Sequence, residues 1–178
     1  MQKTTVALFA MSLASGTAFA QAAPPTSEFV QKAEIGGQLE VQAGHIAATK
    51  GTSAGVKNFG EKMVRDHTRL NEKFKSVLAK DKQDLPKETP LDTEAQDSLN
   101  KLNSASANDF DKLYVDMMVD DHKKDIADFE SYAKGGDDKL IRAAARQALP
   151  TLKEHLMMAE KLQRRENRSS ALSTGSMR

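Results

Sequence analysis

The sequence contains no cysteine and no tryptophan. The absence of cysteine excludes disulfides, thiolate metal sites and cysteine nucleophiles. Aromatic residues are few, with seven phenylalanines and two tyrosines, and the 26 lysines and arginines nearly balance the 25 aspartates and glutamates. A protein that binds nucleic acid is expected to carry a strongly basic face. The balanced charge and the scarcity of aromatic residues therefore predict that nucleic acid is not a partner.

The amino terminus has the pattern of a secretory signal peptide. Lys3 precedes a mostly apolar run, and Ala18-Phe19-Ala20 fits the small-x-small pattern of a cleavage site. The run is too short to span a membrane, which takes about 20 apolar residues. We expect residues 1–20 to be cleaved after Ala20, which removes Lys3 and lowers the net charge from +1 to zero. The mature chain is then expected in the periplasm or outside the cell, without a transmembrane segment.

Apolar residues recur at a spacing of three or four in four long segments, which predicts amphipathic helices. The long helices are expected at residues 27–50, 54–80, 107–133 and 138–165, with a short extra helix at 93–103. Glycine-marked turns join the first two and the last two long helices, and a longer connection with two prolines separates the pairs. The sequence therefore predicts an all-α fold, an antiparallel four-helix bundle with the short helix in its long connection.

The remaining segments complete the expected organisation. Residues 21–26 are predicted to be a linker, residues 27–165 the bundle, and the polar residues 166–178 a disordered tail. Pro150 is expected to kink or restart the last helix, because proline removes a backbone hydrogen bond. Gly44 and Gly60 fall near the same level of the first helix pair, so we expect these helices to approach closely there.

Each predicted long helix carries one ionisable residue on its apolar stripe. These residues are Glu40, His67, His122 and His155. A rise of 1.5 Å per residue places all four within two or three helical turns of one another. The remaining histidine, His45, follows a different line along its helix and is expected at the rim.

Two interpretations of the four residues remain open. Imidazole and carboxylate groups together suit a transition metal such as iron, copper or zinc, and methionines three or four residues from the histidines (Met63, Met118 and Met158) would favour copper. The alternative is a buried polar network, in which the histidines hydrogen-bond to one another, to Glu40 or to Tyr114. Methionine is also an ordinary filler of helical cores. The identity of any cofactor is therefore left open.

An acidic residue immediately precedes each of the three histidines. These acids are Asp66, Asp121 and Glu154. Neighbours on a helix point about 100° apart, so such an acid is not expected to share a ligand with its own histidine. It is placed to orient an imidazole ring on an adjacent helix, or it marks the start of the solvated face.

Several short motifs on these helices resemble a known family. They are Phe29…Glu40, Met63-Val64-x-Asp66-His67, Phe110-Asp111-x-x-Tyr114…His122 and Leu149-Pro150-x-Leu152-x-x-His155-Leu156. Together they resemble the domain of unknown function 4142 over roughly residues 27–163. The resemblance implies a ferritin-like four-helix bundle in an exported bacterial protein, often labelled an outer-membrane protein, whose biochemical role is not settled.

The sequence departs from the di-iron ligand pattern of ferritin-like enzymes and from the outer-membrane label. Ferritin-like di-iron enzymes carry a glutamate three residues before the histidine, where this chain has Val64, Val119 and Leu152. This difference counts against ferroxidase or oxygenase chemistry. Integral outer-membrane proteins are closed barrels of strands, so the helical pattern leaves only a peripheral association with the envelope.

Two functions follow as hypotheses. The first is a small exported metal-binding protein for storage, buffering or envelope stress, with Glu40, His67, His122 and His155 as ligands. The second is a non-catalytic envelope protein that acts through its surface, with structural histidines. An enzyme is less favoured, because the chain contains no His-Glu-x-x-His or phosphate-loop motif. Its Gly-x-Ser-x-Gly match, at residues 51–55, falls in the predicted turn between two helices and not between a strand and a helix. The sequence leaves the oligomeric state open.

Overall fold

The computed structural model describes residues 23–81 and 89–175. In these ranges the chain forms five α-helices and no strand: α1 (Thr26–Lys50), α2 (Ala54–Asp81), α3 (Thr93–Ser104), α4 (Ala107–Gly135) and α5 (Lys139–Gly175). The predicted all-α fold is confirmed, and every predicted helix is present. The predicted signal peptide, residues 1–20, lies outside the described residues. Within the described ranges, no helix combines the length and the apolar character needed to cross a membrane.

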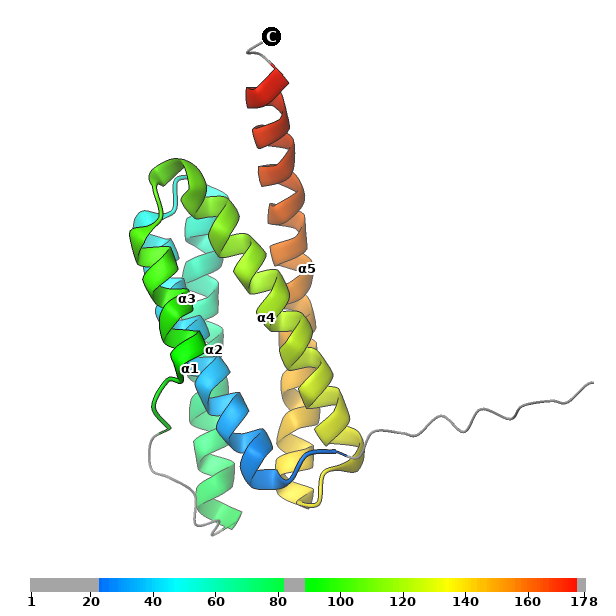
Figure 1. Ribbon diagram of the computed structural model, residues 1–178. Coiled ribbons are helices and arrows are strands. Elements are labelled where there is room, and N and C mark those ends of the chain that lie inside the picture. Colours follow the sequence, from blue (N-terminus) through cyan, green and yellow to red (C-terminus); the bar gives the residue numbers. More distant parts are fainter. Residues whose placement is uncertain (1–22, 82–88, 176–178) are drawn as a thin grey trace, which may run out of the picture.

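The long helices pack as two hairpins (Figure 1). A short turn at residues 51–53 joins α1 to α2, and another at residues 136–138 joins α4 to α5. Contacts of α2 with α5 and of α1 with α4 join the hairpins into a bundle, while α3 packs mainly against α1. Residues far apart in the sequence are thereby brought to the same level of the bundle.

Polar side chains fix the connections between these helices. The carboxylate of Asp111 on α4 accepts hydrogen bonds from the backbone N–H groups of Thr52 and Ser53, both at 2.7 Å, at the start of α2. A negative charge is favourable at a helix N-terminus. Lys50 at the end of α1 donates to the carbonyl oxygens of Leu102 and Asn103, which lie at the end of α3. The turn of the first hairpin is therefore attached to α4, and α3 is attached to α1.

The predicted close approach of α1 and α2 is confirmed at two glycines. A Cβ atom added to Gly44 would lie 2.8 Å from the carbonyl oxygen of Gly60, and one added to Gly60 would lie 2.7 Å from that of Gly44. Such distances are shorter than van der Waals contact, so any larger residue would push the helices apart. The two glycines therefore set the spacing of the first hairpin.

Buried apolar side chains form two clusters along the bundle. The Phe59 cluster lies toward the 51–53 turn and includes Val56, Phe59, Met63, Phe110, Tyr114, Met118 and Leu162. The Phe29 cluster lies toward the 136–138 turn and includes Phe29, Phe74, Phe129, Tyr132, Ile141 and Leu152. In the second cluster the Phe29 ring stacks on Tyr132 at a centroid distance of 4.1 Å and meets Phe129 edge-on at 5.0 Å.

Helix α5 is longer than predicted. It continues to Gly175, ten residues past the predicted end, and Figure 1 shows its last turns projecting beyond the bundle. Extending an existing helix requires no new nucleation, and residues 166–174 contain no proline or glycine. Pro150 lies inside α5 without causing a restart.

The N-cap residue of α3 is Asp92. Its side chain accepts a hydrogen bond from the N–H of Ala95 at 2.8 Å.

Candidate metal centre

The structure brings the four predicted residues together between the two apolar clusters. Glu40 comes from α1, His67 from α2, His122 from α4 and His155 from α5, and each is at most 2% exposed. On every helix, residues of one apolar cluster precede the position and residues of the other follow it. We call these four residues the histidine layer. Four helices thus each supply one ionisable group at a single level of the bundle.

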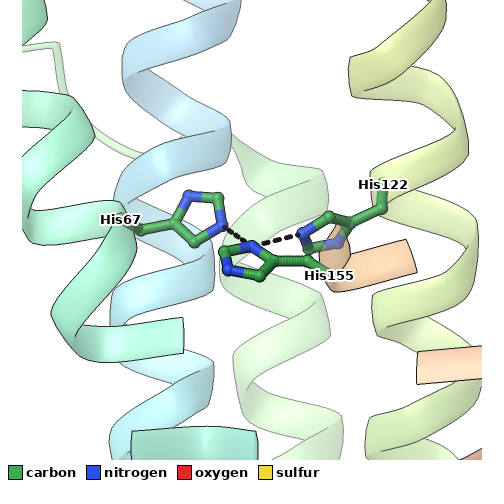
Figure 2. Close-up of side chains that lie close together, drawn as sticks. All are labelled: His67, His122 and His155. Carbon is green, nitrogen blue, oxygen red and sulfur yellow. Dashed lines mark hydrogen bonds between the residues drawn. The ribbon is translucent and has the colours of Figure 1, made fainter. Parts of the chain in front are cut away.

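One nitrogen of each imidazole ring points toward a common centre (Figure 2). Nδ1 of His155 lies 3.2 Å from Nε2 of His67 and 3.4 Å from Nε2 of His122. The three histidines offer ligand atoms that all lie within 4.8 Å of one another. No other group of three or more histidine, aspartate or glutamate side chains in the described part of the chain has this arrangement.

The opposite nitrogen of each ring lies beside an oxygen atom. Nε2 of His155 donates a hydrogen bond to Asp66 at 2.9 Å, and Nδ1 of His122 donates to the carbonyl oxygen of Met118 at 2.9 Å. Nδ1 of His67 lies 2.7 Å from a carboxylate oxygen of Glu40, and the other Glu40 oxygen lies 3.3 Å from Nδ1 of His122. These contacts fix which nitrogen of each ring points toward the common centre.

The electrostatics keep all three rings neutral at pH 7. Burial lowers the pKa of His67, His122 and His155 from 6.5 to about 4, because the interior disfavours the charged imidazolium. A neutral imidazole that donates from one nitrogen carries a lone pair on the other. His122 donates to a carbonyl, which can only accept, so its Nε2 carries a lone pair. The inward nitrogen of His155 carries one for the same reason, and these two lone pairs face each other.

The partner of His155 belongs to a small charged network at the edge of the core. Asp66 also accepts a hydrogen bond from Lys62 at 2.8 Å, and Lys62 lies 3.1 Å from Glu154. Burial opposes the ionisation of Asp66, but the hydrogen bonds from Lys62 and His155 outweigh it and lower its pKa. Asp66 is therefore an ionised acceptor. The predicted role of such an acid, orienting a ring on an adjacent helix, is confirmed for Asp66.

Glu40 is the carboxyl group of the histidine layer. Its residue is 1% exposed, and neither oxygen has a well-aligned hydrogen-bond partner within the described ranges. Burial raises its pKa from 4.5 to about 7, although the nearby His122 partly offsets this effect. Its two oxygens approach the outer nitrogens of His67 and His122, not the centre where the three inward nitrogens meet.

Two further acidic residues of α4 have raised pKa values: Asp125, which the sequence did not single out, and Asp121, which it singled out only as the acid that precedes His122. Burial and the charge of Glu40 raise the pKa of Asp125 well above its ordinary value. Burial also raises the pKa of Asp121 to about 6, and its Oδ2 has no hydrogen-bond partner within the described ranges. Asp125 follows His122 by three residues, which places both on one helical face. This spacing was the available signal for Asp125.

The other sequence predictions for this region have mixed outcomes. His45 is exposed, as expected. Met63 and Met118 are fully buried in the Phe59 cluster, as expected of core fillers. The hydroxyl of Tyr114 is buried, and it has no hydrogen-bond partner in the described part of the chain. The suggested hydrogen bond between a histidine and Tyr114 is therefore absent, because the hydroxyl is enclosed by the apolar side chains of that cluster.

Comparison with protein families identifies the chain at the family level. The model of the domain of unknown function DUF4142 matches residues 11–162. The chain belongs to this family. The resemblance noted in the motifs of this DUF4142 protein is thereby confirmed. No curated protein and no solved structure matches the chain.

Proposed function

We propose that this DUF4142 protein binds a transition-metal ion through the inward nitrogens of His67, His122 and His155. The observation that carries the proposal is the spacing of these nitrogens. A tetrahedral ion with metal–nitrogen bonds of about 2.0–2.1 Å holds its ligand atoms about 3.3 Å apart. The two separations around His155 are 3.2 and 3.4 Å. His155 is therefore already at ligand spacing from both other rings, and the His67 and His122 nitrogens, which lie within 4.8 Å of each other, would close on the ion.

The protonation of the rings supports the same proposal. Metal ligands must present a lone pair, and all three rings are neutral at pH 7. Without an ion, the facing lone pairs of His122 and His155 repel each other. The N–H of His67 can satisfy the nitrogen of His155 but leaves that of His122 without a donor. A cation at the centre would satisfy all three.

Glu40 takes a supporting role in this proposal and is not assigned as a ligand. Its oxygens lie beside the outer nitrogens of His67 and His122. A carboxylate at this position holds a ring in the tautomer that ligates a metal and makes its other nitrogen more basic. Asp66 does the same for His155. The negative charges of both groups would also offset the charge of the cation.

Three protein ligands leave one position of a tetrahedral ion open. Structural zinc sites are closed by four protein ligands, so an open site favours exchange of the ion or of a fourth ligand. This supports storage or buffering of a metal, including a role in envelope stress. Imidazole suits zinc, copper and iron, and the burial of Met63 and Met118 among apolar side chains gives no support for thioether ligands selective for copper.

We further propose the architecture and location that accompany this function. The four long helices, α1, α2, α4 and α5, would form an antiparallel ferritin-like bundle, with α3 in the long connection. Their arrangement in two hairpins supports this reading. The signal-peptide pattern of residues 1–20 supports export to the periplasm or beyond the cell.

Metal analysis tests the proposal directly. The protein is purified without an affinity tag, depleted with a chelator, and then dialysed in turn against zinc, iron and copper. We expect about one ion per chain for at least one metal, and loss of that ion in a triple alanine variant of His67, His122 and His155. The His45→Ala variant is the control and should retain the metal. Substoichiometric loading of the unmodified protein by all three metals would refute the proposal.

A second candidate is a surface-acting envelope protein with structural histidines. The hydrogen bonds of His155 to Asp66 and of His122 to Met118, which need no metal, favour it. In this case a single His→Ala change would lower stability equally in the presence and absence of metal, because a partner is left unsatisfied. Added metal would then leave the melting temperature of the unmodified protein unchanged.

A further inference from the structure

A cavity reaches the histidine layer from the side of α1 and α2. The three histidines are at most 2% exposed, so an ion needs a path to them. The cavity has a volume of about 80 Å³, and its lining includes Glu40, His67 and Asp125. One water molecule needs about 10–15 Å³ of such volume. The space can therefore hold several waters, or an ion with part of its hydration shell.

The cavity wall changes character from the surface inward. Exposed Lys73 and Lys75 lie at its outer end, and the amides of Gln38 and Asn71 line its side. Asn71 follows His67 by one helical turn, so its amide lies on the same face of α2. A Cβ atom on Gly37 would overlap the side-chain oxygen of Asn71, so the glycine leaves room for this amide. Polar side chains thus line part of the cavity, together with apolar ones such as Phe74 and Leu152.

The carboxyl groups of Glu40 and Asp125 both line this cavity. Glu40 is buried, and neither of its oxygens has a well-aligned hydrogen-bond partner within the described ranges. Asp125 lines the same cavity from α4. Two neighbouring carboxyl groups in a low-dielectric environment disfavour each other's ionisation, and a cation placed between them favours the ionised form of both. Glu40 also contacts the outer nitrogens of two proposed ligands, so it connects the cavity to the metal centre.

We propose that this cavity is the port through which a hydrated divalent cation reaches the three histidines, with Glu40 and Asp125 as its first binding point. The proposal rests on the proposed function, since it describes the route to the same metal centre. Carboxylate and amide oxygens replace part of the hydration shell of the ion before the imidazole nitrogens bind it.

The test compares the kinetics of zinc binding in the full chain with and without a blocked cavity. Ala148 lines the cavity on α5 and is buried, so Ala148→Leu fills part of it. Ala143 is exposed on the same helix, and Ala143→Leu is therefore a matched control. Zinc association is followed by stopped-flow with a fluorescent zinc indicator, and zinc dissociation by transfer to a chelator. Circular dichroism verifies folding, and Ala144→Val replaces Ala148→Leu if that variant does not fold.

A port predicts a specific kinetic signature. Ala148→Leu should slow zinc association and dissociation together, each by about tenfold or more, with little change in affinity or stoichiometry. Asp125→Asn should slow association several-fold, because a neutral amide binds a divalent cation less strongly than a carboxyl group that can ionise when the cation arrives. Ala143→Leu should match the unmodified protein.

Each contrary result has a distinct meaning. If the unmodified protein binds one zinc ion, and Ala148→Leu and Asp125→Asn both match its association and dissociation rates within twofold, the port is refuted and the metal centre stands. If Ala148→Leu lowers affinity by speeding dissociation alone, the cavity supports the site but is not the route, and the port is again refuted. If the unmodified protein binds no metal, the proposed function fails and the port fails with it.

Discussion

The Phe29 cluster and the histidine layer are neighbours in one bundle, but different forces hold them. In the Phe29 cluster, aromatic rings from α1, α2 and α4 pack against one another, and burial itself is favourable. In the histidine layer, burial is unfavourable for each polar group, and hydrogen bonds such as those of His155 to Asp66 and of His122 to Met118 offset part of this cost. The contribution of the Phe29 cluster to stability should therefore not change with pH or with added metal. The contribution of the histidine layer should depend on the hydrogen-bond partners of its side chains and on their protonation. The following predictions use this difference.

The largest effect is expected at Phe29, which is fully buried and contacts three other aromatic rings. Phe29→Ala should lower the free energy of unfolding by about 3–5 kcal/mol, because it removes apolar burial and leaves a cavity. Urea unfolding measures this change. The loss should be the same at pH 5 and pH 8 and with or without zinc depletion, and a strong pH dependence would contradict the contrast drawn above.

A smaller but more specific effect is expected at His122. His122→Ala should lower the free energy of unfolding by about 1–3 kcal/mol in the metal-free protein, because it removes the hydrogen bond to the carbonyl of Met118 and leaves the buried space of the ring empty. It should also abolish the rise in melting temperature that saturating metal gives the unmodified protein. Calorimetry of both proteins, with and without metal, separates the two effects. A variant that still gains stability from metal would remove His122 from the site.

The three histidines and Glu40 should have opposite effects on how the stability of the protein changes with pH. The histidines have a pKa of about 4 in the folded protein against 6.5 for an unperturbed imidazole, so the unfolded chain binds more protons between these values. Their contribution to stability is lost as the pH falls from about 6.5 to 4. Glu40 has the opposite sign, because its pKa rises from 4.5 to about 7 and its ionisation opposes folding as the pH rises.

Replacing Glu40 by glutamine should remove the effect of Glu40 ionisation on stability. Relative to the unmodified protein, metal-free Glu40→Gln should gain on the order of 1–2 kcal/mol as the pH rises from about 4.5 to 7. Urea unfolding at several pH values measures the difference between the two proteins. A constant difference across this range would show that Glu40 titrates normally in the folded protein.

The smallest effect is expected at His45, the histidine outside the layer. His45 is exposed on α1, so His45→Ala should change the free energy of unfolding by less than about 0.5 kcal/mol. The same urea series provides the measurement. A loss comparable to that of His122→Ala would show that histidine removal alone, and not the layer, causes the destabilisation.

The helices were predictable because their signals are local. Spacings of three and four residues identified the four long helices, and glycines identified the turns of both hairpins. The extension of α5 to Gly175 was missed because the sequence of residues 166–175 has no apolar periodicity. A polar segment reads as disordered from composition, although an existing helix can continue through it.

The membership of the site was also predictable, but its geometry was not. One ionisable residue on each stripe singled out Glu40, His67, His122 and His155, and the turns gave their approximate levels. Sequence spacing does not determine ring rotation, however, so it could not show which nitrogen faces inward or that Glu40 contacts the outer nitrogens. Asp125 was missed because Ile126, beside it, continues the apolar stripe.

The division of the chain into two hairpins has a consequence for how the histidine layer forms. Glu40 and His67 belong to the α1–α2 hairpin, and His122 and His155 belong to the α4–α5 hairpin. The hydrogen bond from His155 to Asp66 also crosses between them. Neither hairpin alone can assemble the three inward nitrogens, so the layer is complete only when the two hairpins are docked. An ion bound by all three histidines would therefore link the two hairpins, and binding to the docked state alone would stabilise it against separation.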